Sequence, residues 1–382
     1  MDFSLSSEQQ ALVDAAARFA REQLAPGYRA REKAECIEPE IISAMGQMGF
    51  LGSELPEEAG GLGVDCLTSG LLMEQIAYGD FNVAYVNLLA SLCGQIVFSH
   101  ARSDEARDWL AQVVSGDKSI AIALTEPGAG SDAANLKLKA ERDGRDFILS
   151  GEKTSISMAT QSHVTVVFAR TGSEADGARG ISAFLVPMDL PGISRTQFDD
   201  IGTRPVGRGS IFFDQVRLSE NLLLGDEGQG FVQVMQGFDY SRALIGLQCL
   251  AVARASLDET WRYAQEREAF GKTIAEFQGV SFPLAESETL YEACRLLCLR
   301  TLWLKDQGMP HTAEAAMCKW WAPKLACDII HQCLLTHGHG GYGADYGFGQ
   351  RYRDVMGLQI GDGTANIMKV IIARQKLMQY RA

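Results

Sequence analysis

Residues 118–132 read KSIAIALTEPGAGSD, and the hydrophobic pattern of the chain changes within this stretch. Before it, apolar residues recur every three or four positions, as they do on one face of a helix. From Ile120 onward they alternate in short runs that Gly, Asp and Pro separate, which is typical of strands. The stretch therefore marks the passage from a helical part of the chain to a β part.

The same patterns predict the elements on either side. Before Ile120 we expect helices that follow the cap residue Ser6 and then cover 39–48, 67–79, 82–99 and 103–114. The expected strands are 120–124, 147–149, 163–169, 181–186 and 210–218, which indicate a small antiparallel barrel or sandwich. Longer helices follow at 230–267, 275–307, 311–337 and 363–380.

These elements predict a mainly α protein with a central β domain. The boundaries we infer are an N-terminal helical domain over 1–118, a middle β-barrel domain over 119–226 and a C-terminal four-helix bundle over 227–382. Four long amphipathic helices bury their apolar faces only against one another, which is the reason for expecting a bundle.

Composition excludes some classes of function. The 382 residues carry 35 Lys and Arg against 48 Asp and Glu, a net charge of −13, and no basic stripe, so we expect no nucleic-acid partner. No apolar run reaches the length of a membrane span, and the start does not resemble a signal peptide. Nine cysteines lack CxxC pairs and metal-ligand spacing, so we interpret them as buried thiols, with no metal site, in a cytoplasmic protein.

Two glycine-rich stretches are candidates for function. In Gly361-Asp362-Gly363-Thr364 the carboxylate is either part of a tight turn or a catalytic base on a restricted backbone. In the loop over 125–132, TEPGAGSD, hydroxyls and backbone amides either face an oxygen-rich ligand or form an ordinary connection into a strand. Local composition leaves both alternatives open at each stretch.

Several motifs, taken together and in order, decide between them. They are TEPGAGSD at 125–132, REAFGKTI at 267–274 followed by Phe277-Gln278, HGGYG at 339–343, and Tyr352-Arg353-Asp354 ahead of Asp362-Gly363-Thr364. This series resembles the acyl-CoA dehydrogenase family along essentially the whole chain. The resemblance implies that the protein binds FAD and removes an α-proton and a β-hydride from an acyl-CoA thioester.

The resemblance also implies roles for individual residues. The catalytic base is Asp362. The cofactor contacts are Thr125, Ser131, Ser157, Arg267, Phe270, Gln278, Gly341 and Thr364. The substrate contacts are Ser131, Arg242, Asp239 and Gly363, whereas Arg353 and Asp354 are expected to be structural.

The family also suggests partners. Arg267 and Phe270 match residues that reach the FAD of a neighbouring subunit, which implies a homotetramer. The electron acceptor implied by the family is electron-transferring flavoprotein or a similar protein.

The chain departs from the family pattern at three positions. The base position holds Asp362 where the family usually has Glu, and the alternative base position, on the helix before Arg242, is Ser241. Ser155 replaces the aromatic residue that shields the flavin, and His337 replaces a glutamine. His337 and His339 are each either a hydrogen-bond donor to the cofactor or a structural histidine.

These departures leave three readings of function. The first is dehydrogenation of an acyl-CoA whose acyl group is branched or cyclic, because an aspartate is one methylene shorter than a glutamate. The second is a flavin-dependent oxidase of a non-CoA substrate, since nitroalkane oxidase uses an aspartate at this position. The third is a non-catalytic protein that binds acyl-CoA or an acyl carrier.

Overall fold

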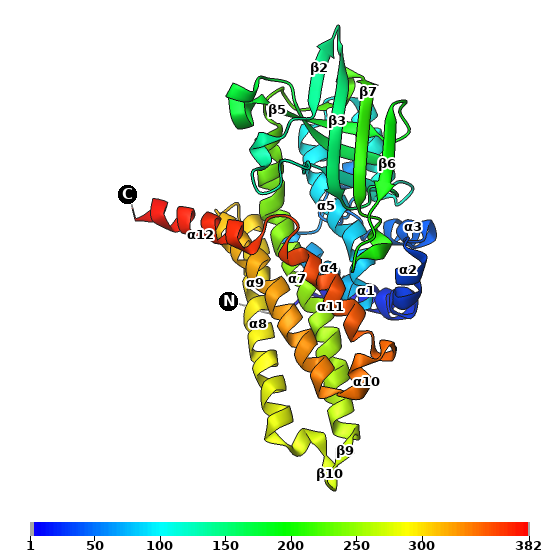
Figure 1. Ribbon diagram of the computed structural model, residues 1–382, viewed down its shortest axis with the longest axis vertical. Helices are drawn as coiled ribbons and strands as arrows, with labels where there is room; N and C mark the ends of the chain where they lie inside the picture. The colour runs from blue at the N-terminus through cyan, green and yellow to red at the C-terminus, as the bar shows by residue number, and fades with distance from the viewer. Residues whose placement is uncertain (1–3, 381–382) are drawn as a thin grey trace. The chain divides into compact units, whose positions relative to one another are not determined.

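The computed structural model describes residues 4–380, and helices flank a central sheet along the chain (Figure 1). The helices before the sheet are α1 (Ser7–Phe19), α2 (Tyr28–Ala34), α3 (Pro39–Gln47), α4 (Cys66–Gly79), α5 (Phe81–His100) and α6 (Asp104–Val114). Those after it are α7 (Gly230–Glu266), α8 (Gln278–Asp306), α9 (Thr312–Thr336), α10 (His339–Tyr342), α11 (Phe348–Met356) and α12 (Ala365–Gln379). The predicted fold class, mainly α with a central β domain, is confirmed.

The sheet holds eight strands. They are β1 (Ile120–Ala123), β2 (Lys139–Asp143), β3 (Asp146–Ile156), β4 (Val164–Arg170), β5 (Ile181–Pro187), β6 (Ile193–Gln197), β7 (Gly209–Leu218) and β8 (Leu223–Leu224). Their order is β6-β7-β3-β2-β4-β5-β8, with β1 beside β4. Most neighbours are antiparallel, but β1 and β2 each pair with β4 in parallel, so the expectation of a purely antiparallel sheet is wrong. The long connection from β1 to β4, which contains β2 and β3, allows this parallel pairing.

Three strands of the sheet were not predicted: the two-residue β8, and β2 and β6, which carry almost no periodic signal. β2 reads KAERD and β6 reads ISRTQ, and most of their side chains are exposed. A strand without a buried face shows no alternation of apolar and polar residues. Their pairing with β3 and β7, respectively, is what places them in the sheet.

The described chain forms two compact units. One contains the chain up to Ala30, Cys66–Ala84 and everything from Arg242 onward, and the other contains Arg31–Asp65 and Tyr85–Ser241. Each unit therefore combines segments from different parts of the sequence. The consecutive domain boundaries inferred above stay a prediction.

Small residues allow close helix packing inside the first unit. A Cβ on Gly70 of α4 would lie 2.3 Å from a methyl carbon of Leu302 in α8, and one on Gly246 of α7 would lie 2.6 Å from the sulfur of Cys298. Larger residues at these positions would push the helices apart. The close approach fixes the long helices on which the candidate site is built.

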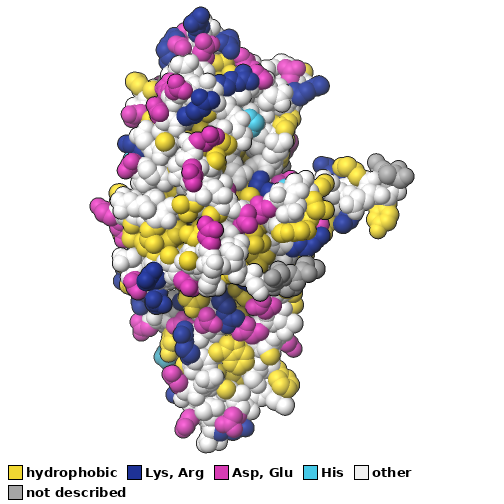
Figure 2. All heavy atoms as spheres, turned by 180° about the vertical axis from the view of Figure 1, so that it is seen from behind, with side chains coloured by type: hydrophobic (Ala, Val, Ile, Leu, Met, Phe, Trp, Pro, Cys, Tyr) yellow, Lys and Arg dark blue, Asp and Glu magenta, His cyan; other side chains and the backbone are white. Residues whose placement is uncertain are grey.

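Two expectations from composition need correction. α5 is apolar and long enough to cross a membrane, although 89% of the apolar window is buried within the protein, as in a core helix. Seven of the nine cysteines are buried, but Cys36 is exposed in the turn after α2, and Cys66 at the start of α4 is half-buried. Figure 2 shows Lys and Arg interleaved with Asp and Glu over one face, which agrees with the absence of a basic stripe from the sequence.

Candidate active site

Asp362 lies on a strained turn between α11 and α12. Its φ is +53°, a left-handed conformation that side-chain-bearing residues rarely adopt, and Gly363 follows at +99°. Thr364 then caps α12 by accepting a hydrogen bond from the backbone N–H of Ile367 at 3.4 Å. Among the described residues, the backbone N–H of Asp362 donates to no acceptor. The turn thus presents a carboxylate and an unused N–H donor together.

A buried lysine from α9 holds this turn. Lys319 has no exposed surface, and its Nζ donates to the carbonyl oxygens of Leu358 at 2.6 Å and Gly363 at 3.2 Å. These two carbonyls lie on either side of Asp362 in the chain. One ammonium group therefore fastens both ends of the turn.

Burial and the nearby positive charges change the pKa of Asp362 in opposite directions. Burial raises the pKa of the Asp362 carboxyl above its ordinary value, while the positive charges of Lys319 and Arg242 lower it. Burial lowers the pKa of Lys319 to about 8, against the charge of Asp362. A carboxylate with a raised pKa and cations nearby is suited to accept a proton.

α7 supplies the neighbouring residues. Arg242 is buried, with 4% of its surface exposed, and Asp239 is half-buried one turn earlier on the helix. Ser241, at the alternative base position, is fully buried and its hydroxyl bonds the carbonyl of Phe238 at 3.5 Å. A buried hydroxyl cannot replace a carboxylate as base, so Asp362 remains the candidate.

The predicted cofactor residues of the second unit gather around β3. The carbonyl of Thr125 accepts from the N–H of Thr154 at 2.9 Å, which ties the TEPGAGSD loop to β3, and Ser157 directly follows this strand. Among the described residues, no group bonds the side-chain hydroxyls of Thr125, Ser131 or Ser157. These hydroxyls are therefore free to bind a ligand.

A buried ion pair supports the same loop. Glu126 accepts from Lys153 Nζ at 2.7 Å and from the backbone N–H groups of Lys137 and Leu138 at 2.6 and 2.9 Å. Lys153 also donates to the carbonyl of Leu124 at 3.0 Å. Burial lowers the pKa of Lys153 to about 8.

The glycines of the loop fit a cofactor. A Cβ added to Gly128 or Gly130 would meet nothing within 4 Å, and neither residue has positive φ. Within the described residues, therefore, neither side-chain packing nor backbone conformation requires glycine at these two positions. A ligand that approaches the backbone closely would require it. Beside them, a cavity of about 260 Å³ is lined by Gly128, Glu126 and Gly151, among others.

Ser155, which replaces the expected aromatic residue, is exposed and has a φ of +60°. The side chain adds no shield on this side of β3. We therefore expect the space that an aromatic ring would fill to be open to a ligand.

The structure does not bring Arg267 and Phe270 near Asp362 within one chain. Arg267 directly precedes, and Phe270 lies within, the hairpin of β9 (Glu268–Ala269) and β10 (Lys272–Thr273), which follows the end of α7 distant from Arg242 (Figure 1). The helix spans about 36 Å between Arg242 and Glu266, at 1.5 Å per residue. Phe270 is 96% exposed, and Gln278 begins α8 just after this hairpin.

His337 is a structural histidine in this arrangement. Its Nδ1 donates to the carbonyl of Cys333 at 2.9 Å, and its ring stacks on Tyr263 with centroids 4.1 Å apart. Burial lowers the pKa of His337, which favours the neutral ring. The buried Nε2, which bonds nothing among the described residues, is then an acceptor, and this favours the structural alternative for His337. Gly341 lies nearby, where a Cβ would be 2.3 Å from the carbonyl of Leu334.

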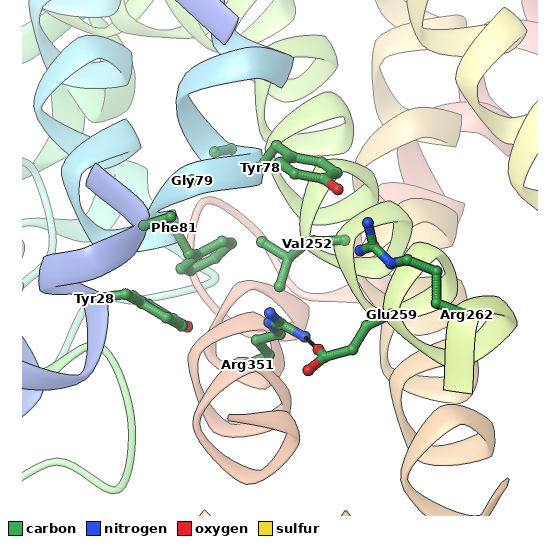
Figure 3. A pocket seen from close by; sticks show the side chains of 11 residues that line it. Tyr28, Tyr78, Gly79, Phe81, Val252, Glu259, Arg262 and Arg351 are labelled. Carbon is green, nitrogen blue, oxygen red and sulfur yellow. Dashed lines mark hydrogen bonds and ion pairs between the residues drawn. The ribbon is translucent and has the colours of Figure 1, made fainter. Parts of the chain in front are cut away.

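A second cavity, of about 440 Å³, lies elsewhere in the first unit (Figure 3). Glu259 and Arg351 form an ion pair at its wall, 2.7 Å apart. None of the predicted site residues lines it. Close to it, Tyr28 donates to the buried Asp354 at 2.6 Å, as does Asn82 at 3.0 Å, so Asp354 has a structural role.

Sequence reasoning missed the two buried lysines. Lys319 stands in the apolar run AAMCKWWA of α9, and Lys153 stands on β3 with buried Leu149 and Ile156. A lone charge within an apolar pattern was the available signal, because such a charge is buried only when partners hold it.

The chain matches three domain families in order. They are the acyl-CoA dehydrogenase N-terminal domain over residues 6–117, its middle domain over 121–216 and its C-terminal domain over 228–377.

Relatives match along nearly the full chain. A probable acyl-CoA dehydrogenase of Bacillus subtilis, YngJ, is 34% identical over 380 residues, which cover 99% of this chain and 100% of the relative. A 3-(aryl)acrylate reductase of Clostridium sporogenes is 33% identical, with 97% and 99% covered. The structure of butyryl-CoA dehydrogenase from Megasphaera elsdenii superposes with a TM-score of 0.95 at 30% identity, covering 99% and 100%. The chain thus belongs to the acyl-CoA dehydrogenase family and is an FAD-dependent oxidoreductase.

Proposed function

We propose that the protein dehydrogenates an acyl-CoA whose acyl group carries a branch or a ring near the α or β carbon, with Asp362 as the base. The observation that carries this proposal is the Asp362 turn. It combines a carboxylate of raised pKa, two nearby cations and an unused backbone N–H. Dehydrogenation of an acyl-CoA follows from the family, whereas the base and the shape of the acyl group are our inference.

The chain's own groups account for proton removal. The Asp362 carboxylate takes the α-proton, and its backbone N–H donates to the thioester oxygen on which negative charge develops. Exclusion of water by the bound substrate raises the proton affinity of the carboxylate further. Bound FAD supplies the hydride acceptor. Thr125, Ser131, Ser157 and Thr364 would bind it, whereas Gly341, which lies beside His337 and Tyr263 near the end of α7, would contact it only from a second chain.

The preference for bulky acyl groups rests on two substitutions. Asp362 is one methylene shorter than the usual glutamate, which leaves room beside the α carbon. Ser155 leaves open the space of an aromatic ring. One relative is named for an aryl-bearing acrylate, and this supports a substrate with a ring.

Arg267 supports assembly into a homotetramer. About 36 Å of α7 separates Arg267 from the Asp362 region of the same chain. This distance is longer than an arginine side chain, so Arg267 does not reach a cofactor bound beside Asp362 in its own chain. A second chain would bring its exposed hairpin to the cofactor. For reoxidation of the cofactor we propose electron-transferring flavoprotein, and the cytoplasmic location stays a prediction.

Anaerobic titration of the purified flavoprotein tests the proposal. Butyryl-CoA, isobutyryl-CoA, cyclohexanecarbonyl-CoA and 3-phenylpropionyl-CoA are added in turn while the absorbance of oxidised flavin is followed. Bleaching by the branched or cyclic thioesters, faster than by butyryl-CoA, is the expected result. Bleaching by a nitroalkane but by none of the thioesters would contradict the dehydrogenase proposal. It would favour a flavin-dependent oxidase of a non-CoA substrate, for which an aspartate base is also expected. Flavin that no compound reduces would favour a binding protein.

A further inference from the structure

Lys319 is a charged residue where the fold would otherwise place an apolar one. It lies in α9 between the buried Ala316 and Ala322, and none of its surface is exposed. Burying an ammonium group is unfavourable unless acceptors replace the hydrogen bonds that it loses with water. The hydrogen bonds with Leu358 and Gly363 supply this replacement, so the position of the turn and the burial of the lysine depend on each other.

The turn has few other attachments near Asp362. The N–H groups of Ile360 and Gly361 both donate to the carbonyl of Gly357 at 3.1 Å, which closes the turn on itself. Thr364 fastens it to α12. Gln359 Nε2 also donates to Cys327 Sγ on α9 at 3.3 Å, but Gln359 precedes Asp362. Among the described residues, Lys319 is therefore the α9 side chain that bonds the backbone on both sides of Asp362.

We propose that Lys319 is a positioning residue for the reaction, which holds the Asp362 turn in its left-handed conformation and keeps the carboxylate ionised by its charge. This inference rests on the proposed role of Asp362 as base. Lys319 itself contacts backbone carbonyls, so it acts through Asp362.

The charged and titratable groups that act on this pair come from two helices and the turn. Arg242 and Cys249 lie on α7, Lys319 on α9 and Asp362 on the turn. Arg242 and Lys319 both lower the pKa of Asp362, so loss of either charge raises it. Burial raises the pKa of the Cys249 thiol well above its ordinary value, which keeps it neutral at working pH.

Two variants separate the donor from the charge. Lys319→Met removes both, whereas Lys319→Gln keeps one donor and removes the charge. Lys324→Met is the matched control, because Lys324 lies on the same helix, is exposed and pairs with Asp328 at 2.5 Å. Each purified flavoprotein is compared with wild type by hydrogen exchange of the resting enzyme and by anaerobic stopped-flow reduction.

Hydrogen exchange measures the turn without any reaction. We expect the amides of residues 357–366 to lose protection in Lys319→Met, to lose less in Lys319→Gln and to stay protected in Lys324→Met. For flavin reduction we expect a rate roughly 100-fold lower in Lys319→Met, the cost of a misplaced reacting group, with little change in substrate affinity. The acid limb of the pH profile should move up by about one unit in both Lys319 variants.

The results also distinguish this inference from the proposed base. If Lys319→Met keeps the wild-type protection of 357–366 and the wild-type pH profile, the positioning role is wrong. If Lys319→Met does not fold, the same two measurements on Lys319→Gln decide whether the positioning role is correct. Asp362→Asn with an undiminished reduction rate would overturn the base, while exchange in the Lys319 variants would still report whether the lysine holds the turn.

Discussion

Lys153 Nζ lies 2.7 Å from Glu126 Oε1, and both residues are buried, with 0% and 8% of their surface exposed. The pair joins the middle of β3 to the TEPGAGSD loop, which also bonds through Glu126 to the backbone of Lys137 and Leu138. The buried Lys153–Glu126 ion pair thus fixes the TEPGAGSD loop, a candidate ligand-binding loop, to the sheet.

The first prediction concerns this pair. Lys153→Met leaves Glu126 without its cation and should lower the free energy of unfolding by about 3 kcal/mol, since breaking a buried pair strands a charge. The loop should also retain FAD less well. Chemical denaturation and the flavin content of the purified protein measure the two effects.

A double variant provides the control. Glu126→Gln with Lys153→Met removes both charges and should cost less than the sum of the two single variants. Additive losses would show that the residues do not interact.

The second prediction concerns Arg267, which lies between the end of α7 and the β9–β10 hairpin. Arg267→Ala should weaken FAD retention, because a guanidinium that meets pyrophosphate charge from a second chain is lost. Unfolding of the apoprotein should change by less than about 0.5 kcal/mol, as for an ordinary exposed residue. Equilibrium dialysis of FAD and analytical ultracentrifugation test both the affinity and the assembly.

Arg262→Ala is a suitable comparison, since Arg262 is exposed in the last two turns of α7, five residues before Arg267. It should leave FAD affinity unchanged. A monomeric protein that binds FAD tightly despite Arg267→Ala would contradict the cross-subunit contact.

The sequence predicts those elements whose positions are encoded by local residue patterns. The ends of α3, α6, α8 and α9 fall within three residues of the expected positions, because their apolar faces and caps are encoded locally. β2 and β6 were not predicted, because exposed strands are set by their neighbours. For the site, the motifs predicted Asp362 and the middle loop, and these assignments stay predictions.

The supports of the site could not be predicted in the same way. Lys319 is 39 residues from Leu358 and 44 from Gly363, and Lys153 is 27 from Glu126. Pairing over such separations depends on packing between elements, which a single sequence does not display. The left-handed φ of Asp362 is one that aspartate tolerates better than most residues, but the sequence does not show which of its turns adopts it.

The third prediction tests the base directly. Asp362→Asn keeps the size of the side chain and removes the proton acceptor, so flavin reduction should slow by about 10² to 10⁴-fold. Stopped-flow reduction with the best substrate measures it, and Asp328→Asn, on the exposed surface of α9, serves as control.

Asp362→Glu examines the proposed preference for bulky acyl groups. The added methylene should fill space beside the α carbon, so the ratio of rates for branched over straight-chain thioesters should fall. An unchanged ratio would mean that the length of the base does not select the acyl group.

The last prediction is the pH dependence of flavin reduction. Burial raises the pKa of Asp362 from its ordinary value of 3.8, against Lys319 and Arg242, which lower it. A raised pKa leaves more of the acid neutral at a given pH, and a neutral acid takes no proton. The rate should therefore be low at acid pH and rise with pH through a midpoint above 3.8.

Substrate should move this midpoint upward. The limiting rate at saturating acyl-CoA reports the enzyme–substrate complex, whereas the second-order rate at low substrate reports the free enzyme. Because bound substrate excludes water from Asp362, the pKa of the complex should exceed that of the free enzyme. Stopped-flow traces over a pH series give both values. A midpoint that does not change on saturation would show that desolvation by substrate does not activate this carboxylate.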